Sequence, residues 1–170
     1  MGPEDHVVMV ALIEGTKAPG FALHGCDGDA YSLHESLKKN SLVVLAFFKV
    51  SCPVCQFEFP YLERLHRSYP SVPIWGISQD DADATQSFAK MFGVTFPTLL
   101  DDGLETTVHY DLTNVPSVFV VGQDMIIKQT IVGFVKAELE KLNHELARCA
   151  GQTLVPLFTF ADEVPELRPG

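Results

Sequence analysis

The sequence has few basic residues and no long apolar run. Its 170 residues include 12 Lys or Arg against 22 Asp or Glu, which gives a formal net charge of −10. Nucleic acids and anionic membrane surfaces attract basic proteins, so we expect neither as a partner. The longest apolar stretch is far shorter than the roughly 20 residues of a spanning helix, which predicts no transmembrane segment.

An export signal is also missing from the sequence as written. Glu4 and Asp5 stand where such a signal carries basic residues, and residues 7–13 form only a marginal apolar core without a small-residue cleavage site. We therefore expect a cytoplasmic protein. A trimmed chain would look the same, which leaves a periplasmic or other extracytoplasmic location as the alternative.

Cysteine is scarce, with four residues in the chain. Cys26 and Cys149 stand alone, and only Cys52 and Cys55 are paired by spacing, so there is no disulfide scaffold of the secreted kind. A structural zinc site needs further ligands close to such a pair, but the next cysteine is Cys149 and no histidine pair has suitable spacing. We expect neither a metal nor another cofactor.

Apolar runs and helical periods alternate along the chain, as in an α/β protein. This order predicts a parallel sheet covered by helices on both faces, and a closing hairpin adds antiparallel edge strands. The expected architecture is a three-layer α/β/α sandwich with a mixed central sheet and an N-terminal hairpin. Strands are expected at 7–13, 21–23, 30–33, 42–48, 72–78, 115–121 and 125–131, and helices at 35–38, after 52, and at 80–92, 105–110 and 135–150.

The chain length favours one domain, because domains commonly run about 100–200 residues. We place that domain at residues 1–151, ending at Gly151, which is expected to stop the last helix. Residues 152–170 are proline-rich and show no clear period, so we treat them as a C-terminal tail.

The most informative motif is Cys52-Pro53-Val54-Cys55, which follows the apolar run 42–48 and opens a helix. Two cysteines at this spacing can close a small disulfide ring. A helix N-terminus stabilises a thiolate, and the thiolate is the attacking species in thiol–disulfide exchange. We therefore expect Cys52 to be the nucleophile and Cys55, one turn inside the helix, to be the more buried, resolving thiol.

Two further residues near the motif have two interpretations each. Glu58 lies one helical turn beyond Cys55, so a partly desolvated carboxylate there can exchange a proton with the resolving thiol. An ordinary solvated helix glutamate is equally compatible with the spacing. Pro116, after Val115, is either a strand-edge proline or a cis-proline that offers backbone to an extended substrate.

With these residues the chain resembles members of the thioredoxin-like superfamily. Within that superfamily it is most similar to the bacterial redoxin group, whose members are related to alkyl hydroperoxide reductase and thiol-specific antioxidant proteins. The resemblance covers about residues 15–151 and includes thiol–disulfide oxidoreductases of that group. A strand-plus-helix insertion at 72–92 is typical of the group. The matching segments are Ala18-Pro19-Gly20-Phe21-Ala22-Leu23, Phe47-Phe48, Cys52-Pro53-Val54-Cys55, Glu58-Phe59-Pro60, Phe96-Pro97-Thr98-Leu99-Leu100-Asp101 and Val115-Pro116-Ser117.

The resemblance implies that Cys52 is the nucleophile, Cys55 the resolving thiol, Glu58 a buried active-site acid and Pro116 a cis-proline. Minimal thioredoxins carry a buried aspartate where this chain has Ala46, so Glu58 would take that role. Trp usually precedes the first cysteine in this fold, whereas Ser51 stands there in this chain.

The expected function is thiol–disulfide exchange with protein disulfides or thiols as substrates and an upstream thiol donor. The alternative is a thiol-dependent peroxidase with antioxidant activity. Peroxiredoxins carry Pro seven and Thr or Ser three positions before the peroxidatic cysteine, and Leu45 and Lys49 occupy those positions before Cys52. A binding module without exchange chemistry has no need for a second thiol, which makes a non-enzymatic function the weakest alternative.

Overall fold

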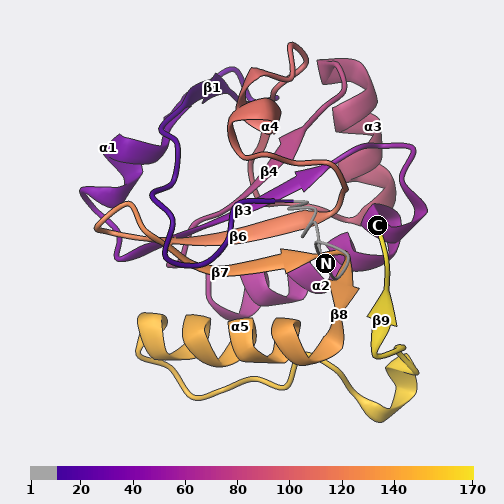
Figure 1. Ribbon diagram of the computed structural model, residues 1–170. Helices are drawn as coiled ribbons and strands as arrows, with labels where there is room; N and C mark the ends of the chain where they lie inside the picture. The colour runs from indigo at the N-terminus through magenta and orange to yellow at the C-terminus, as the bar shows by residue number, and fades with distance from the viewer. Residues whose placement is uncertain (1–10) are drawn as a thin grey trace, which may run out of the picture.

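A computed structural model describes residues 11–170, which form a sheet between helices (Figure 1). The five-stranded sheet has the order β5-β4-β3-β6-β7. The first three of these strands run parallel, whereas β6 and β7 pair antiparallel with their neighbours, so the mixed sheet is confirmed. The bounds are β3 Leu42–Phe48, β4 Ile74–Ser78, β5 Thr98–Leu100, β6 Ser117–Gly122 and β7 Ile127–Val132.

The central strand β3 is buried along its whole length, because helices cover both faces of the sheet. Successive side chains of a strand point to opposite faces. Val44 and Phe48 accordingly belong to the core under α2 (Pro53–Ser68), α3 (Ala82–Phe92) and α5 (Lys136–Ala150). Val43 and Phe47 face the opposite core, which includes residues of α1 (Leu33–Leu37) and Tyr110, next to α4 (Glu105–His109).

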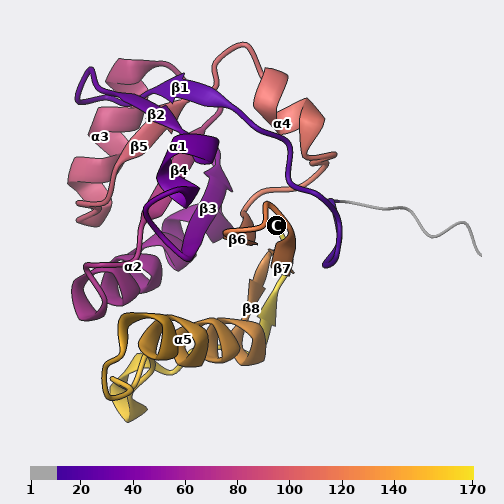
Figure 2. The same cartoon turned by 90° about the vertical axis from the view of Figure 1, so that its left-hand side faces the viewer.

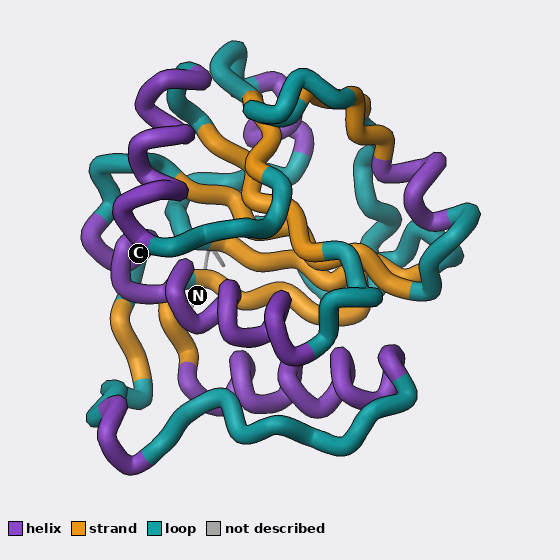
Figure 3. Tube along the Cα trace, turned by 180° about the vertical axis from the view of Figure 1, so that it is seen from behind, coloured by secondary structure: helices purple, strands orange, loops and turns teal. Residues whose placement is uncertain are grey.

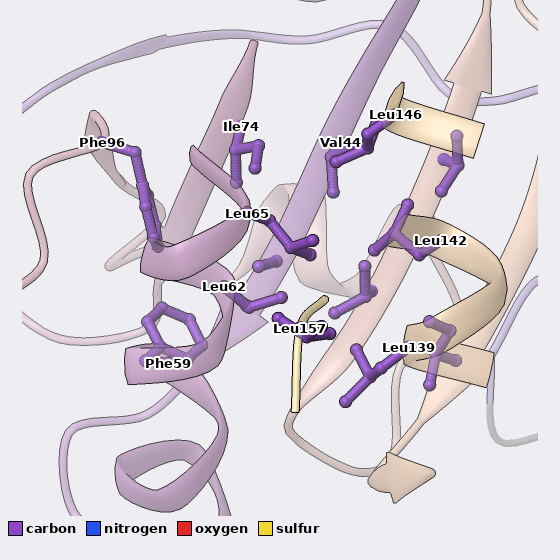
Figure 4. Close-up of a cluster of buried hydrophobic side chains, with 14 of the residues drawn as sticks. Val44, Phe59, Leu62, Leu65, Ile74, Phe96, Leu139, Leu142, Leu146 and Leu157 are labelled. Atoms are coloured by element: carbon purple, nitrogen blue, oxygen red, sulfur yellow. The ribbon is translucent and has the colours of Figure 1, made fainter. Parts of the chain in front are cut away.

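The two helical layers are visible from the side, where α5 and α4 lie on opposite sides of the sheet (Figure 2). Around the α2 and α5 side, leucines from both helices interlock above β3 and β4 (Figure 4). The three-layer α/β/α sandwich expected from the sequence is therefore correct.

A side-chain cap and two glycines mark helix ends, including the expected stop at Gly151. The Asp81 carboxylate accepts a 2.8 Å hydrogen bond from the Ala84 amide at the start of α3, and Gly93 ends that helix with φ 70°. Gly151 ends α5 with φ 65°. Both glycines adopt the left-handed conformation that other residues avoid. Helix α2 continues through Pro60.

Upstream of the sheet, β1 (Ala22–His24) and β2 (Ala30–Ser32) form the predicted antiparallel hairpin. The predicted strand at 7–13 lies mostly outside the described residues, and residues 11–13 are not strand. Within the expected strand-plus-helix insertion, β4 lies inside the sheet beside β3, and the edge position belongs to β5, which follows α3.

The segment after Gly151 packs against the domain, which its lack of periodicity did not indicate. Leu157 is buried between α2 and α5 (Figure 4). A short 3-10 helix, η1 (Phe160–Asp162), follows, and then β9 (Leu167–Arg168) pairs antiparallel with β8 (Phe134–Val135). This pairing brings the end of the described chain back to the segment that follows β7. The division of the chain at residue 151 stays a prediction.

Candidate active site

Cys52 caps the N-terminus of α2, immediately after β3 and its loop. The Cys55 amide donates a hydrogen bond to the Cys52 sulfur over 3.2 Å, and Pro53 occupies the first turn, where its missing N–H leaves no donor unpaired. An amide donor and the positive end of the helix dipole both suit a negatively charged sulfur. The local geometry therefore favours thiolate chemistry at Cys52.

The loop before Cys52 is held by hydrogen bonds to the backbone amide and the backbone carbonyl of Val50. The Val50 amide donates to the Asp80 carboxylate over 2.8 Å, and the Gln56 side chain donates to the Val50 carbonyl over 2.9 Å. The sequence analysis did not assign this role to Asp80. The signal was available, because Asp80 follows β4, and the carboxyl ends of neighbouring parallel strands lie at the same sheet edge.

The two sulfurs differ in accessibility as predicted. Cys52 is partly exposed, whereas Cys55 is 0% exposed, and both are free thiols in this structure. Burial raises the pKa of the Cys55 thiol above its ordinary range, and the hydrogen bond with Cys52 and the negative charges of Cys52 and Glu58 add to the rise. Cys55 therefore stays protonated until a group removes its proton.

Glu58 is fully buried on the same helix, one turn beyond Cys55. Neither carboxylate oxygen has a hydrogen-bond partner among the described residues. Burial without compensation raises the pKa of this carboxyl well above its ordinary value of 4.5. The solvated-glutamate interpretation left open by the spacing is wrong, because this acid is completely removed from water.

The Val115–Pro116 peptide bond is cis and lies against the nucleophile. The Cys52 thiol donates to the Val115 carbonyl over 3.5 Å, which joins the two segments across the site. The loop is fixed from two sides: the Ser117 hydroxyl donates to the Asn114 carbonyl over 2.8 Å, and the Gly133 amide donates to the Pro116 carbonyl over 2.8 Å. Among the predicted site residues, Cys52, Cys55 and Val115 are linked directly, and Glu58 and Pro116 flank them.

The candidate site does not coincide with the hollow at the far end of the sheet. A hollow of about 740 Å³ lies elsewhere, where Leu42 and Gly122 mark the far ends of β3 and β6, and none of the predicted site residues lines it. The remaining cysteines lie apart, with Cys26 near the Ala82 carbonyl and Cys149 near the Ser41 hydroxyl.

Within residues 11–170, no three His, Cys, Asp or Glu side chains are grouped so that they would hold a metal ion. In the same part of the chain, no helix combines the length and apolar character needed to cross a bilayer.

The sheet order, the CxxC pair at a helix start and the adjacent cis-proline define a thioredoxin-like protein. Solved structures share this fold. One from Bacteroides thetaiotaomicron, provisionally named a protein disulfide isomerase, has a TM-score of 0.74 at 25% identity and covers 84% of this chain and 92% of its own. Another from Chlorobium tepidum, provisionally named the thiol:disulfide interchange protein DsbE, has a TM-score of 0.72 at 26% identity and covers 83% and 100%.

The chain belongs to the AhpC/TSA family, whose sequence pattern matches residues 15–130. The thiol-disulfide oxidoreductase ResA of Bacillus subtilis is 28% identical over 126 residues, which cover 72% of this chain and 69% of ResA. Family, fold and relatives together make the chain a thiol–disulfide oxidoreductase, as the sequence predicted.

Proposed function

We propose that Cys52 and Cys55 exchange two electrons with disulfides or thiols of protein partners, and that an upstream thiol donor resets the pair. The observation that carries this proposal is the arrangement of the sulfurs. The sulfur of the partly exposed Cys52 accepts a hydrogen bond from the Cys55 amide at the N-terminus of α2, whereas the Cys55 side chain is buried. The Cys52 sulfur can therefore react with a partner protein, whereas the buried Cys55 sulfur can react only with Cys52.

In the reductive direction, the Cys52 thiolate attacks one sulfur of a partner disulfide. A Cys52–partner bond forms, the partner S–S bond breaks, and the leaving partner thiolate takes up a proton. Cys55 then loses its proton and attacks the Cys52 sulfur. This step forms the Cys52–Cys55 disulfide and releases the second partner thiolate, which also takes up a proton, so the partner gains two electrons and two protons in all. The opposite direction reverses each step.

Glu58 is the group we assign to the proton of Cys55. The thiol of Cys55 and the carboxyl of Glu58 lie one helical turn apart on α2, and both are buried away from water. This burial is the main reason why the pKa of each group is raised. An acid with a raised pKa can hold a proton in one half of the exchange and accept it back in the other. Ala46, at the position of the acid in minimal thioredoxins, has no group for this purpose.

Val115 and Pro116 are the residues we assign to substrate binding. The Val115 carbonyl lies 3.5 Å from the Cys52 sulfur, so a peptide running along this backbone would bring its own sulfur next to Cys52. Main-chain pairing of this kind gives affinity for an extended polypeptide, and contacts with its side chains add the preference for particular residues.

A peroxidase is the weaker alternative. Leu45, which stands where peroxiredoxins carry a proline, is an interior residue of β3 with 0% exposure, and Lys49 replaces the hydroxyl residue. Neither residue supplies the loop that activates a peroxide. We expect turnover of hydrogen peroxide with a thiol donor to be far slower than exchange with a protein disulfide.

The test uses a background in which Cys26 and Cys149 are replaced by serine. Iodoacetamide should label Cys52 much faster than Cys55 at neutral pH. Cys55→Ser should accumulate a mixed disulfide with a protein disulfide such as insulin, because the resolving attack is lost, whereas Cys52→Ser should trap nothing. Faster labelling of Cys55, or no trapped species with Cys55→Ser, would contradict the assignment.

The compartment is proposed on the sequence alone: the cytoplasm, with an extracytoplasmic space as the alternative. Fractionation of cells that express the native gene would separate the two.

A further inference from the structure

The end of the described chain lies on the candidate active site. Strand β9 pairs with β8 in antiparallel register, with Arg168 opposite Phe134, and the Lys136 amide donates to the Glu166 carbonyl over 2.9 Å. This pairing directs the following residues toward the cis-proline loop. Seen from behind, the chain end marked C overlaps the start of a long helix (Figure 3), and its contact with the Val115 carbonyl, which the Cys52 sulfur also touches, places it near the N-terminus of α2.

Gly170 lies against the Val115 carbonyl, to which the Cys52 thiol also donates a hydrogen bond. The Asn114 side-chain amide donates to the Gly170 carbonyl over 3.3 Å. A β-carbon built on Gly170 would overlap the Val115 carbonyl oxygen and lie 3.3 Å from Pro116 Cδ. The Val115 carbonyl is thus approached by the Cys52 sulfur and also by tail backbone at close range. Only a residue without a side chain fits this approach.

Arg168 contacts the other element of the site. Its guanidinium lies 4.7 Å from the centre of the Phe57 ring, which belongs to α2 two residues beyond Cys55. A cation above an aromatic face is attracted by the ring electrons. The backbone of Arg168 also packs closely against Gly133, because a β-carbon built on that glycine would lie only 2.8 Å from the Arg168 carbonyl oxygen.

The tail is held in reach of the site by contacts upstream. Arg64 forms two 2.8 Å hydrogen bonds to the Asp162 carboxylate and a third, of 3.1 Å, to the Leu157 carbonyl. The Tyr69 hydroxyl also accepts from the Val155 amide over 3.0 Å. Anchoring up to residue 162 leaves only a short tether to residues 167–170, which gives them a high effective concentration at the site.

We propose that residues 167–170 occupy the strip of surface on which a partner polypeptide docks, and that they mark the kind of segment it accepts. The strip, here called the docking strip, consists of Phe57, Asn114, Val115, Pro116 and Gly133. Its partner is an extended peptide with a basic side chain over Phe57 and, two residues later, a glycine over Val115. This inference rests on the proposed function and adds its substrate class.

The tail then competes with the partner for one surface. A site occupied by its own chain for about nine-tenths of the time binds a partner about tenfold more weakly than an open site. Small disulfides that reach Cys52 without lying along the docking strip would escape most of this competition. The proposal therefore predicts different effects on protein and small-molecule substrates.

The test compares Gly170→Ala and Arg168→Ala with Phe160→Ala, a matched variant in the same tail whose side chain is fully exposed and away from the site. Exchange is measured with insulin and with a small aromatic disulfide. Gly170→Ala and Arg168→Ala should lower the KM for insulin about tenfold, with little change for the small disulfide. Phe160→Ala should match the wild type.

A capped peptide with the sequence of residues 165–170 provides the second measurement. It should bind Gly170→Ala in calorimetry and compete with insulin, whereas the same peptide with alanine for arginine should bind more weakly. Tail variants that match the wild type, together with no peptide binding, would overturn the proposal. If no disulfide is exchanged by any variant, the proposed function fails, and the calorimetry still decides whether the docking strip exists.

Discussion

Helix α2 carries two buried glutamates five residues apart that have opposite surroundings. Glu58 is 0% exposed and has no hydrogen-bond partner within residues 11–170, whereas Glu63 is 5% exposed and accepts three hydrogen bonds. The Thr95 amide and hydroxyl each donate to Glu63 over 2.7 Å, and Arg67 donates over 2.8 Å. The same residue type on one helix is thus left unsatisfied near the cysteines and fully satisfied away from them.

The pKa values follow from this difference. At Glu63, burial raises the pKa, but the hydrogen bonds from Thr95 and Arg67 outweigh it and the pKa falls below its ordinary value. At Glu58 only burial acts, and the pKa rises. Burial therefore does not by itself make a proton carrier. Glu63 is a fixed negative charge that ties α2 to the Thr95 loop, and Glu58 is the carboxyl that can gain and lose a proton.

The largest contrast is expected in exchange rate. Glu58→Gln should slow exchange with insulin about 100-fold at neutral pH, because general acid–base assistance contributes at least about that factor. Glu63→Gln should keep the wild-type rate, since its carboxylate holds hydrogen bonds away from the sulfurs. Stopped-flow measurement of the resolving step compares them, and equal rates for the two variants would remove the distinction.

Stability should respond in the opposite order. Glu63→Gln should lower the free energy of unfolding by about 2 kcal/mol, because it disturbs hydrogen bonds of a buried, charged acceptor. Glu58→Gln leaves no partner unsatisfied and should be no less stable than the wild type at neutral pH. Urea unfolding of the reduced proteins measures both. A large loss for Glu58→Gln would reveal a structural role that its surroundings do not indicate.

The pH dependence of stability should separate the two acids most finely. With a raised folded-state pKa, Glu58 keeps its proton longer than in the unfolded chain, so stability falls as pH rises above about 4.5, by up to about 1.4 kcal/mol per unit. With a lowered pKa, Glu63 contributes stability that is present above about 4.5 and lost as pH falls through the folded-state pKa. Subtracting the unfolding curves of Glu58→Gln and Glu63→Gln from the wild type should give slopes of opposite sign.

The sequence predicted the parts of the molecule that depend on local pattern. The predicted strand 42–48 has the same bounds as β3, because seven consecutive Leu, Val, Ala and Phe residues match the length and composition of a strand buried on both faces. The stop of α5 at Gly151 was also predicted, since it depends on one residue and its near neighbours. The placement of Cys52 at a helix start followed from the same reasoning.

Contacts between distant segments were not predictable in this way. Glu63 depends on Thr95, which is 32 positions away, and the Cys52 loop depends on Asp80, 30 positions from Val50. The tail shows the same limit, because proline-rich composition indicates a lack of helix and strand periods but does not say what surface the segment covers. Spacing also left Glu58 undecided, since burial of one helix face depends on what packs against it.

The position of Gly170 has a practical consequence for work at the bench. A purification tag fused directly after this residue would begin at the Val115 carbonyl, a few ångströms from the reactive sulfur. We expect such a fusion to alter the measured kinetics of the enzyme, because the added residues would lie at the docking strip. A cleavable tag at the other end of the polypeptide avoids that artefact.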